Sequence, residues 1–310
     1  MNLIQRRRKR MRTKVLIIDG EGLLHQSFHK FTNFKSTDGK PSGAIFGFFK
    51  SLHMYMERFY PDIVNIVFDN GHSKYRTEIW PEYKAHRKNI SIDFESLQEQ
   101  KKQIMRVLKW LRIPYIFDKK KETGYEGDDF VAWLRYMKYG NRDEYTQTII
   151  TSDKDYNQLL SKDVKIFNPR KGEMVTDSNC KELFGYTSRE TVDYLCLVGD
   201  TSDDIPGVKG YGPVKTRKFL DKYFFVDEAF KKNECLEIKE IYDRNKKLID
   251  LQWFIENHPL KEIPWHKKNQ KDPNWKRFKE FCIEYSLSSF MTDIFMKPFK
   301  EYATLNRIYP

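Results

Sequence analysis

The chain of 310 residues is 39% hydrophobic and 32% charged, and its formal net charge is +12. At roughly 150 residues per domain this length predicts about two domains, and the composition indicates a globular protein rather than a low-complexity chain. No stretch reaches the apolar length of a membrane span and the N-terminus lacks a secretory signal, so we expect a cytoplasmic protein without membrane contact.

The balance of charge favours a polyanionic partner. Lys and Arg number 56 against 44 Asp and Glu, and the pI is near 9.2. Nucleic acid is the first candidate for such a partner, although a solvated basic surface explains the same excess. Residues 1–12 contain "RRRKRMR" and predict a basic arm that either adds phosphate affinity or keeps the chain soluble.

Cysteine and histidine spacing gives no sign of a zinc site. The cysteines are Cys180, Cys196, Cys235 and Cys282. They form no CxxC pair, so we expect reduced packing residues rather than a disulfide framework or a zinc site. His25 and His29 are four residues apart, but no glutamate completes a zinc-protease pattern.

Short apolar runs alternate with helical patterns over the first part of the chain. Runs that end in acids or a turn predict buried strands at residues 14–20, 62–70, 146–155 and 164–169. Between them, in residues 128–138, apolar side chains recur at helical spacing at Phe130, Trp133, Leu134 and Met137. This alternation predicts an α/β fold with a mainly parallel sheet, whose strand ends gather at one rim.

From about residue 190 the pattern becomes helical. The stretches "TVDYLCLVG" and "VKTRKFLDKYF" flank a glycine-rich turn, and "NWKRFKEFCIEYSLSSF" near the C-terminus predicts an amphipathic helix. A further helix is predicted in residues 91–111, with Ile104, Leu108 and Leu111 on one face. We expect a change of domain near residue 190.

Acids gather at the predicted strand ends and turns. We call them the rim acids: Asp19, Asp69, Glu126, Asp128, Asp129, Asp153, Asp155, Asp200 and Asp203. Carboxylates packed closely repel one another unless cations neutralise them, and oxygen ligands without His or Cys select Mg²⁺ or Mn²⁺. Their number suggests two metal ions, an arrangement that hydrolyses phosphodiesters. For any one acid alone, a helix cap or turn former remains the simpler interpretation.

The glycine turn follows directly on two of these acids. Its residues Gly207, Val208, Gly210 and Gly212 match the helix-hairpin-helix pattern GVxGxG. Glycine lets the backbone approach a phosphate closely, and the next helix offers free amides together with Lys215, Thr216, Arg217 and Lys218. Such contacts grip the nucleic-acid backbone, so binding should depend on structure and salt rather than base sequence. A plain loop is the alternative.

These stretches, in this order, resemble the 5′ nuclease family of flap endonucleases and 5′-3′ exonucleases, especially the nuclease module of bacterial DNA polymerase I and its free-standing phage relatives. The resemblance runs from Val15 to Tyr223 through "IIDGEGLLHQSFHKF", "VFDNGHSKYRTEIWPEYKAHR", "TGYEGDDFVA", "TSDKDYNQLL" and "VGDTSDDIPGVKGYGPVKTRKFL". It implies a PIN-like catalytic domain at 13–189 with a helical arch at about 84–112. A helix-hairpin-helix subdomain and helical tail would occupy 190–310.

The resemblance also implies roles for individual residues. All the rim acids fall on metal-site positions, and Asp19, Asp69, Asp128 and Asp153 would lie among the catalytic groups. Lys84 and Arg87 match basic residues directed at the scissile phosphate, where cations offset developing charge. Tyr83 would stack on a base. Without the surrounding motifs, residues 82–88 would read as a solvated helix face.

The expected activity is cleavage of DNA at a 5′ flap or 5′ end near a junction, in replication or repair, including removal of RNA primers from RNA–DNA hybrids. The resemblance implies two Mg²⁺ or Mn²⁺ ions, with K⁺ at the hairpin left open. We expect a separate, monomeric protein in a bacterium or phage-infected cell, open to replication partners. A PIN-like endoribonuclease would lack the hairpin and the Asp200 and Asp203 pair. A non-catalytic junction-binding protein would have lost a metal acid.

Overall fold

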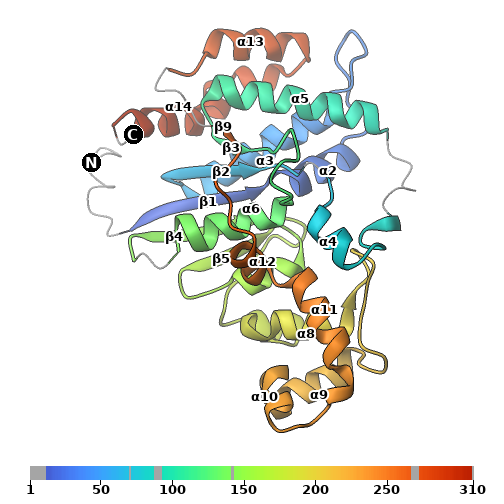
Figure 1. Cartoon of the computed structure of the whole chain (residues 1–310). Coiled ribbons are helices and arrows are strands. Elements are labelled where there is room, and N and C mark those ends of the chain that lie inside the picture. Colours follow the sequence, from blue (N-terminus) through green and yellow to red (C-terminus); the bar gives the residue numbers. More distant parts are fainter. Residues whose placement is uncertain (1–11, 70, 87–92, 141–142, 267–271, 309–310) are drawn as a thin grey trace.

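The computed structural model describes residues 12–69, 71–86, 93–140, 143–266 and 272–308 (Figure 1). The predicted basic arm, apart from Arg12, and the predicted catalytic residue Arg87 lie outside the described residues. Arg12 is anchored, since its guanidinium donates hydrogen bonds to Asp163 Oδ1 at 2.7 Å and to the carbonyl of Tyr145 at 2.6 Å.

A seven-stranded sheet organises the fold in the order β6-β5-β4-β1-β2-β3-β9. Its strands are β1 (Thr13–Asp19), β2 (Ile63–Val67), β3 (Tyr115–Ile116), β4 (Tyr145–Ile150), β5 (Val164–Asn168), β6 (Glu173–Val175) and β9 (Trp265–His266). The five inner strands run parallel, and β6 and β9 pair antiparallel at the two edges. Their carboxyl ends therefore meet at one rim, as the sequence predicted.

Helices cover both faces of the sheet, and β1 shows why. Leu16 and Ile18 point into one core and Val15 and Ile17 into the other, so the strand reads as a continuous apolar run. The first core is closed by α2 (Gly20–Lys30), α3 (Gly43–Phe59), α5 (Phe94–Leu111), α13 (Trp275–Glu284) and α14 (Asp293–Ile308). The second is closed by α6 (Gly127–Trp133), α7 (Cys180–Phe184) and α12 (Leu251–Asn257).

A third core joins the remaining helices below the sheet in Figure 1. Its elements are α4 (Lys74–Ile79), α8 (Thr191–Val198), β7 (Gly199–Asp200), β8 (Ile205–Pro206), α9 (Pro213–Tyr223), α10 (Val226–Lys231) and α11 (Lys239–Ile249). Short 3₁₀ helices lie at Lys154–Leu159, Ser188–Glu190, Leu236–Ile238 and Ser288–Met291. The α9–α10 end projects farthest from the sheet (Figure 1).

One predicted apolar face is partly wrong. Phe130 and Leu134 are buried, but Met137 is 56% exposed. The chain passes from α6 into a π-helix, Leu134–Lys138, whose wider turn shifts later side chains away from the α-helical stripe.

The C-terminal tail returns to the first core rather than extending beyond the hairpin. Strand β9 pairs with β3, α13 packs on α5, and α14 packs on α3. The hydroxyl of Tyr302 in α14 accepts a hydrogen bond of 3.2 Å from the backbone N–H of Val64 in β2. The residues after about 250 therefore help to build the sheet layer that carries the acids.

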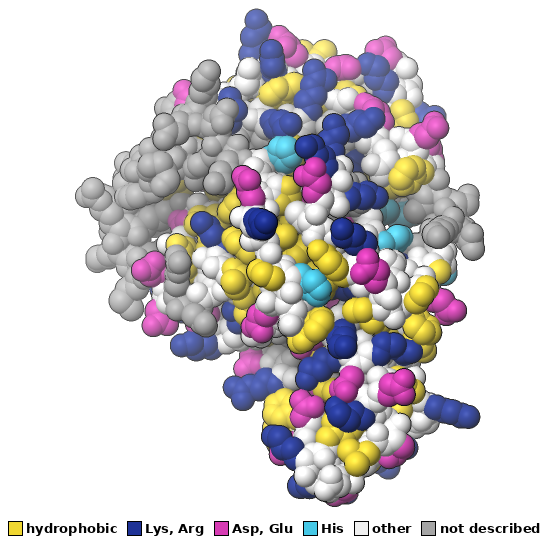
Figure 2. Space-filling view, in the orientation of Figure 1, with side chains coloured by type: hydrophobic (Ala, Val, Ile, Leu, Met, Phe, Trp, Pro, Cys, Tyr) yellow, Lys and Arg dark blue, Asp and Glu magenta, His cyan; other side chains and the backbone are white. Residues whose placement is uncertain are grey.

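Surface features agree with a compact, basic protein. On the face seen in Figure 2, Lys and Arg are spread over the layer of α5 and α13 and around the α9–α11 helices, with acids between them. Cys180, Cys196 and Cys282 are buried free thiols, whereas Cys235 is partly exposed. Within the described residues, no helix has both the length and the apolar character required to cross a bilayer.

Candidate functional site

The structure brings the rim acids together where β1, β2 and β4 end. Asp19 is the last residue of β1, Asp69 follows β2, and Asp153 follows β4. Glu126, Asp128 and Asp129 come from the start of α6, and Asp155 from the 3₁₀ helix beyond β4. The β7–β8 hairpin adds Asp200 and Asp203.

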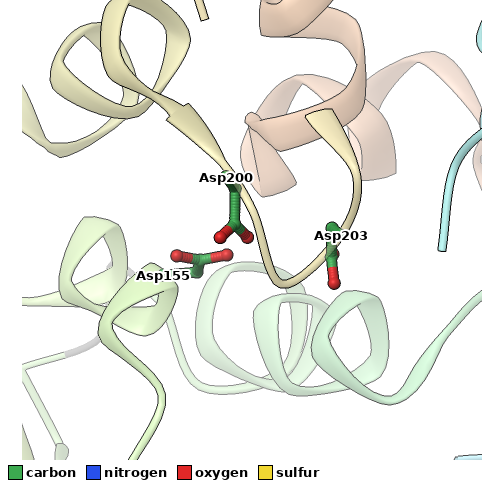
Figure 3. Close-up of side chains that lie close together, drawn as sticks. All are labelled: Asp155, Asp200 and Asp203. Atoms are coloured by element: carbon green, nitrogen blue, oxygen red, sulfur yellow. The ribbon is translucent and has the colours of Figure 1, made fainter. Parts of the chain in front are cut away.

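Asp155, Asp200 and Asp203 form the tightest group (Figure 3). One carboxylate oxygen of each lies within 4.8 Å of the others, and the Asp155 and Asp200 carboxylates point toward one another. Oδ1 of Asp155 is buried without a hydrogen-bond partner. Burial, reinforced by the neighbouring charges, raises the pKa of Asp155 well above its usual value. The group therefore fits a divalent cation that prefers oxygen ligands.

Asp200 is held in place by its own hairpin. Its Oδ1 accepts hydrogen bonds from the backbone N–H of Ser202 at 3.1 Å and from the Ser202 hydroxyl at 2.9 Å. The Lys154 ammonium lies 3.6 Å from Asp200 Oδ1 and is partly exposed. The orientation of the carboxylate is thus fixed before any ligand arrives.

Asp19 is oriented by the start of α2 and by the end of β4. Its Oδ1 accepts a hydrogen bond from Gly22 N at 2.8 Å, and its Oδ2 accepts one from Thr151 Oγ1 at 3.0 Å. Burial raises the pKa of Asp19 to about 6, even though both hydrogen bonds favour the charged form. Asp153 adds to the rise through its negative charge.

Asp69 and Glu126 have opposite protonation tendencies. Burial, followed by the charge of Glu126, raises the pKa of Asp69 to about 8. Burial also disfavours the charged form of Glu126, but Lys84 and Arg76 outweigh it and lower the pKa of Glu126 to about 2. A cation near Asp69 must therefore displace a proton at neutral pH.

Lys84 lies between Glu126 and Asp203 and forms ion pairs with both. Its Nζ is 2.6 Å from Glu126 Oε2 and 3.4 Å from Asp203 Oδ2, and the residue is 5% exposed. Its backbone adopts a φ of 55° and donates a hydrogen bond of 3.0 Å to the carbonyl of Asp203. The ammonium thus offsets the negative charge of Glu126 and Asp203.

The placement of Tyr83 differs from what stacking on a base requires. Its hydroxyl donates to Glu126 Oε2 at 2.7 Å and lies 3.2 Å from Asp203 Oδ2. The residue is only 3% exposed, so its ring offers no open face in this structure. Stacking would need the segment around Tyr83 to move.

Asp128 and Asp129 are adjacent but differently placed. Asp129 is fully buried, and the Arg76 guanidinium donates to both of its oxygens, at 2.8 and 2.7 Å. Asp129 Oδ2 also accepts a hydrogen bond of 2.9 Å from the backbone N–H of Glu126. Asp128 is partly exposed in the first turn of α6, where its Oδ1 accepts from Asp129 N at 2.8 Å.

The glycine turn joins α8 and α9 beside the acids. A Cβ on Gly207 would lie 2.3 Å from the carbonyl oxygen of Val198, so only glycine fits there. Gly210 has a φ of 82°, and a Cβ on Gly210 or Gly212 would meet nothing within 4 Å. The backbone at both positions is therefore open to an incoming ligand. Val208 is 6% exposed and packs inside the third core.

The side chains at the start of α9 divide into two kinds. Lys215 and Lys218 are exposed, and the Lys215 ammonium lies 4.0 Å from the centroid of the Tyr211 ring. Thr216 is fully buried and donates from Oγ1 to the carbonyl of Tyr211 at 3.2 Å. Arg217 instead donates to the carbonyl of Phe184 at 3.3 Å. Within the described part of the chain, neither the Lys215 nor the Lys218 ammonium makes a hydrogen bond or ion pair, so both charges remain available to a ligand.

Sequence reasoning missed the residues that orient the acids. They are Glu21, Ser73, Arg76, Lys101, Thr151, Lys154 and Ser202. Lys101, for example, comes from the middle of α5 and donates hydrogen bonds of 2.6 Å to Glu21 Oε2 and to the carbonyl of Asp69. A lysine on a predicted buried helix face was the available signal, because such a charge needs a partner.

Comparisons with known proteins agree with this geometry. Residues 14–185 match the family model for the 5′-3′ exonuclease, N-terminal resolvase-like domain. A DNA polymerase I of Caldicellulosiruptor bescii is 33% identical over 90% of the chain, which spans 33% of that relative. A 5′-3′ exonuclease of Buchnera aphidicola is 31% identical, and the match covers 77% of the chain and 80% of that protein.

Solved structures share the fold at lower identity. A phage T5 5′-exonuclease with bound zinc ions has a TM-score of 0.65 and 17% identity, covering 94% of this chain and 99% of the other. A phage T5 flap endonuclease in complex with DNA and metal ions has a TM-score of 0.64 and 18% identity, covering 94% and 98%. They confirm the predicted α/β fold. With the family model matching over half of its length, the chain belongs to the 5′-3′ exonuclease family.

Proposed function

We propose that the chain is a metal-dependent, structure-specific 5′ nuclease that cleaves DNA at 5′ flaps or 5′ ends near junctions. The observation that carries this proposal is the position of two rim acids on the hairpin that leads into the glycine turn. Asp200 and Asp203 lie on the same hairpin that leads into Gly207, Gly210 and α9. A duplex gripped at the turn would therefore present its backbone to the acids.

The acids divide into two candidate sites for Mg²⁺ or Mn²⁺. Asp155, Asp200 and Asp203, with Asp153 beside them, would hold one ion; Asp19, Asp69, Glu126 and Asp128 would hold the other. Divalent ions at such sites activate water and stabilise the leaving oxygen. The T5 relatives with bound metal ions support the same metal dependence for this chain.

The basic groups of the chain would bind and orient the substrate. Lys84, which pairs with Glu126 in this structure, would pair with the scissile phosphate in the complex, and Arg87 would be a second cation there. Lys215, Lys218 and the open backbone at Gly210 and Gly212 would hold the phosphates of the downstream duplex. We also propose that the turn can bind a monovalent ion such as K⁺ and that the 5′ strand can be RNA in an RNA–DNA hybrid. The protein would act as a monomer, open to a replication partner.

Asp153→Asn tests the catalytic assignment. The substitution keeps the shape of the side chain but removes a charge beside Asp155, so flap cleavage in Mg²⁺ should fall at least about 100-fold. Binding of a flap duplex in Ca²⁺ should remain within about twofold of wild type. Asp38→Asn, in an exposed loop, is the matched control and should cleave normally. Undiminished cleavage by Asp153→Asn would refute the metal assignment, and cleavage by neither wild type nor control would favour a non-catalytic junction-binding protein.

A further inference from the structure

Arg76 is the largest fully buried side chain among the described residues, and its contacts extend from the rim acids to helices outside the acid sites. It lies in α4 with 1% of its side chain exposed. A buried guanidinium is costly unless every face is paired. The partners of the buried guanidinium therefore indicate its role.

The guanidinium contacts three elements besides its own helix. Its Nη atoms donate to Asp129 of α6 at 2.8 and 2.7 Å, and its Nε donates to the carbonyl of Leu248 in α11 at 2.9 Å. The plane lies 4.3 Å from the centroid of the Phe254 ring in α12. One side chain thus connects α4, α6, α11 and α12.

This connection reaches Glu126 through Asp129. Asp129 Oδ2 accepts from both Arg76 and the backbone N–H of Glu126, which fixes the first turn of α6. Arg76 Nη1 also lies 3.6 Å from Glu126 Oε2. The other Glu126 oxygen accepts from Ser73 N at 2.7 Å, from the residue that precedes α4. Displacing Arg76 would therefore remove the support of the first turn of α6 and loosen α4 at Ser73, leaving Glu126 held by Tyr83 and Lys84 alone.

The far end of the connection belongs to the helices that follow the glycine turn. Leu248 lies in the last turn of α11, and Asn245 of the same helix donates to the carbonyls of Cys196 in α8, at 2.8 Å, and Pro206 in the hairpin, at 2.9 Å. Helix α11 is thus hydrogen-bonded through Asn245 to α8 and the β7–β8 hairpin, and through Leu248 to Arg76.

We propose that Arg76 is a positioning residue that aligns Glu126 for metal binding and ties that alignment to the docking of the glycine-turn helices. This inference rests on the proposed function. Asp129, accordingly, acts as the support that Arg76 holds rather than as a metal ligand. The role needs a planar fork, because a lysine at this position offers one compact charge and cannot reach Asp129 and Leu248 with the same geometry.

The test compares Arg76→Lys with a matched arginine. Arg135→Lys is the control, since Arg135 also donates to a buried carbonyl, that of Leu159 at 3.1 Å, and lies over an aromatic ring, Tyr136, at 4.5 Å. Three quantities are measured for each: Mn²⁺ affinity without DNA by electron paramagnetic resonance, flap-duplex affinity in Ca²⁺, and the single-turnover cleavage rate across Mg²⁺ concentrations.

Arg76→Lys should weaken Mn²⁺ affinity at least about tenfold, the loss typical of groups that orient metal ligands. Its cleavage rate should fall by a similar factor at limiting Mg²⁺ and recover in part at high Mg²⁺, with a normal thermal unfolding transition. Arg135→Lys should stay within about twofold of wild type throughout. Wild-type Mn²⁺ affinity in folded Arg76→Lys would overturn the proposal, as would an equal loss in Arg135→Lys.

A second variant covers the case in which Arg76→Lys does not fold. The double substitution Arg76→Gln with Asp129→Asn replaces the buried ion pair by neutral amides, so it removes the unpaired charge that a single change leaves behind. It should fold and bind Mn²⁺ at least about tenfold more weakly. Wild-type Mn²⁺ affinity in the double variant would refute the proposal. If wild type itself failed to cleave flaps, the proposed function would fail, whereas the metal-binding comparison would still decide the role of Arg76.

Discussion

At the scale of single residues, the site is a set of carboxylates that the fold has forced together. Loss of water raises the pKa of Asp19 to about 6 and that of Asp69 to about 8. Lys84 and Arg76 keep Glu126 ionised despite its burial. The metal-free protein therefore holds protons at this rim that a divalent cation must replace.

Asp69 predicts a pH dependence of stability with a definite sign. Its folded-state pKa of about 8 exceeds the unfolded value near 3.9, so its stabilising contribution is fully present below pH 4 and is lost progressively as pH rises through 8. In EDTA, Asp69 alone should lower the free energy of unfolding measured with urea by about 2 kcal/mol between pH 6 and 8. Saturating Mg²⁺ should reduce this fall.

Asp69→Asn is the control for that measurement, because it removes this one titrating group while the other buried acids with raised pKa values, such as Asp155, still titrate. The fall of stability in EDTA should therefore be smaller in the variant than in wild type. Equal falls in EDTA for wild type and Asp69→Asn over the same interval would contradict the assignment of a raised pKa to Asp69.

The identity of the acids was predictable from sequence, but their supports were not. Asp19, Asp69 and Asp153 follow apolar runs, and parallel strands bring such ends together whatever their order in the chain. Arg76 donates to Asp129, 53 residues away in the sequence, and Lys101 donates to the carbonyl of Asp69, 32 residues away. The position of Lys101 on the predicted buried face of α5 was a local signal, whereas only the packing of α4 decides that Arg76 points inward.

At the scale of elements, the basic side chains at the start of α9 differ in whether they are free to bind a ligand or bond within the protein. Lys215 and Lys218 are exposed beside the open backbone of Gly210 and Gly212, whereas Arg217 bonds to α7 through the carbonyl of Phe184. The sequence predicted all three as equivalent phosphate contacts, because their spacing alone does not reveal that α7 lies against one side of the helix.

Lys215→Ala and Arg217→Ala should therefore behave differently. Loss of Lys215 should weaken duplex binding and lower the slope of log affinity against log salt by about one, since one phosphate contact disappears. Loss of Arg217 should leave the slope nearly unchanged and reduce thermal stability slightly. The measurement is a salt titration of fluorescent duplex binding in Ca²⁺. Equal slopes for Lys215→Ala and wild type would remove Lys215 from the interface.

Element prediction succeeded where one periodicity governs a segment. The face of α5 formed by Ile104, Leu108 and Leu111 is buried as expected. Prediction failed where the backbone leaves the regular helix, as at Met137, whose exposure follows from the π-helix. The neighbouring strands β3 and β9 are only two residues long, too short to show an alternation of apolar and polar side chains.

At the scale of the whole molecule, the two functional units are joined by chain that passes between them more than once. The glycine-turn helices share a core with α4, and the tail then returns through α12 and β9 to α13 and α14 on the sheet. The domain boundary predicted near residue 190 marks the point where the sequence changes from alternating strands and helices to a helical pattern. We propose that the two units position the substrate together, one holding the duplex and the other the strand to be cut.

The most direct test of that account is cleavage of a 5′-labelled flap duplex, beside a blunt duplex and a free single strand of the same sequence, in Mg²⁺ and in EDTA. We predict a short labelled product released near the junction of the flap substrate in Mg²⁺, little product from the other two, and none in EDTA. Tight binding of the flap without any product in Mg²⁺ or Mn²⁺, or equal cleavage of all three substrates, would contradict it.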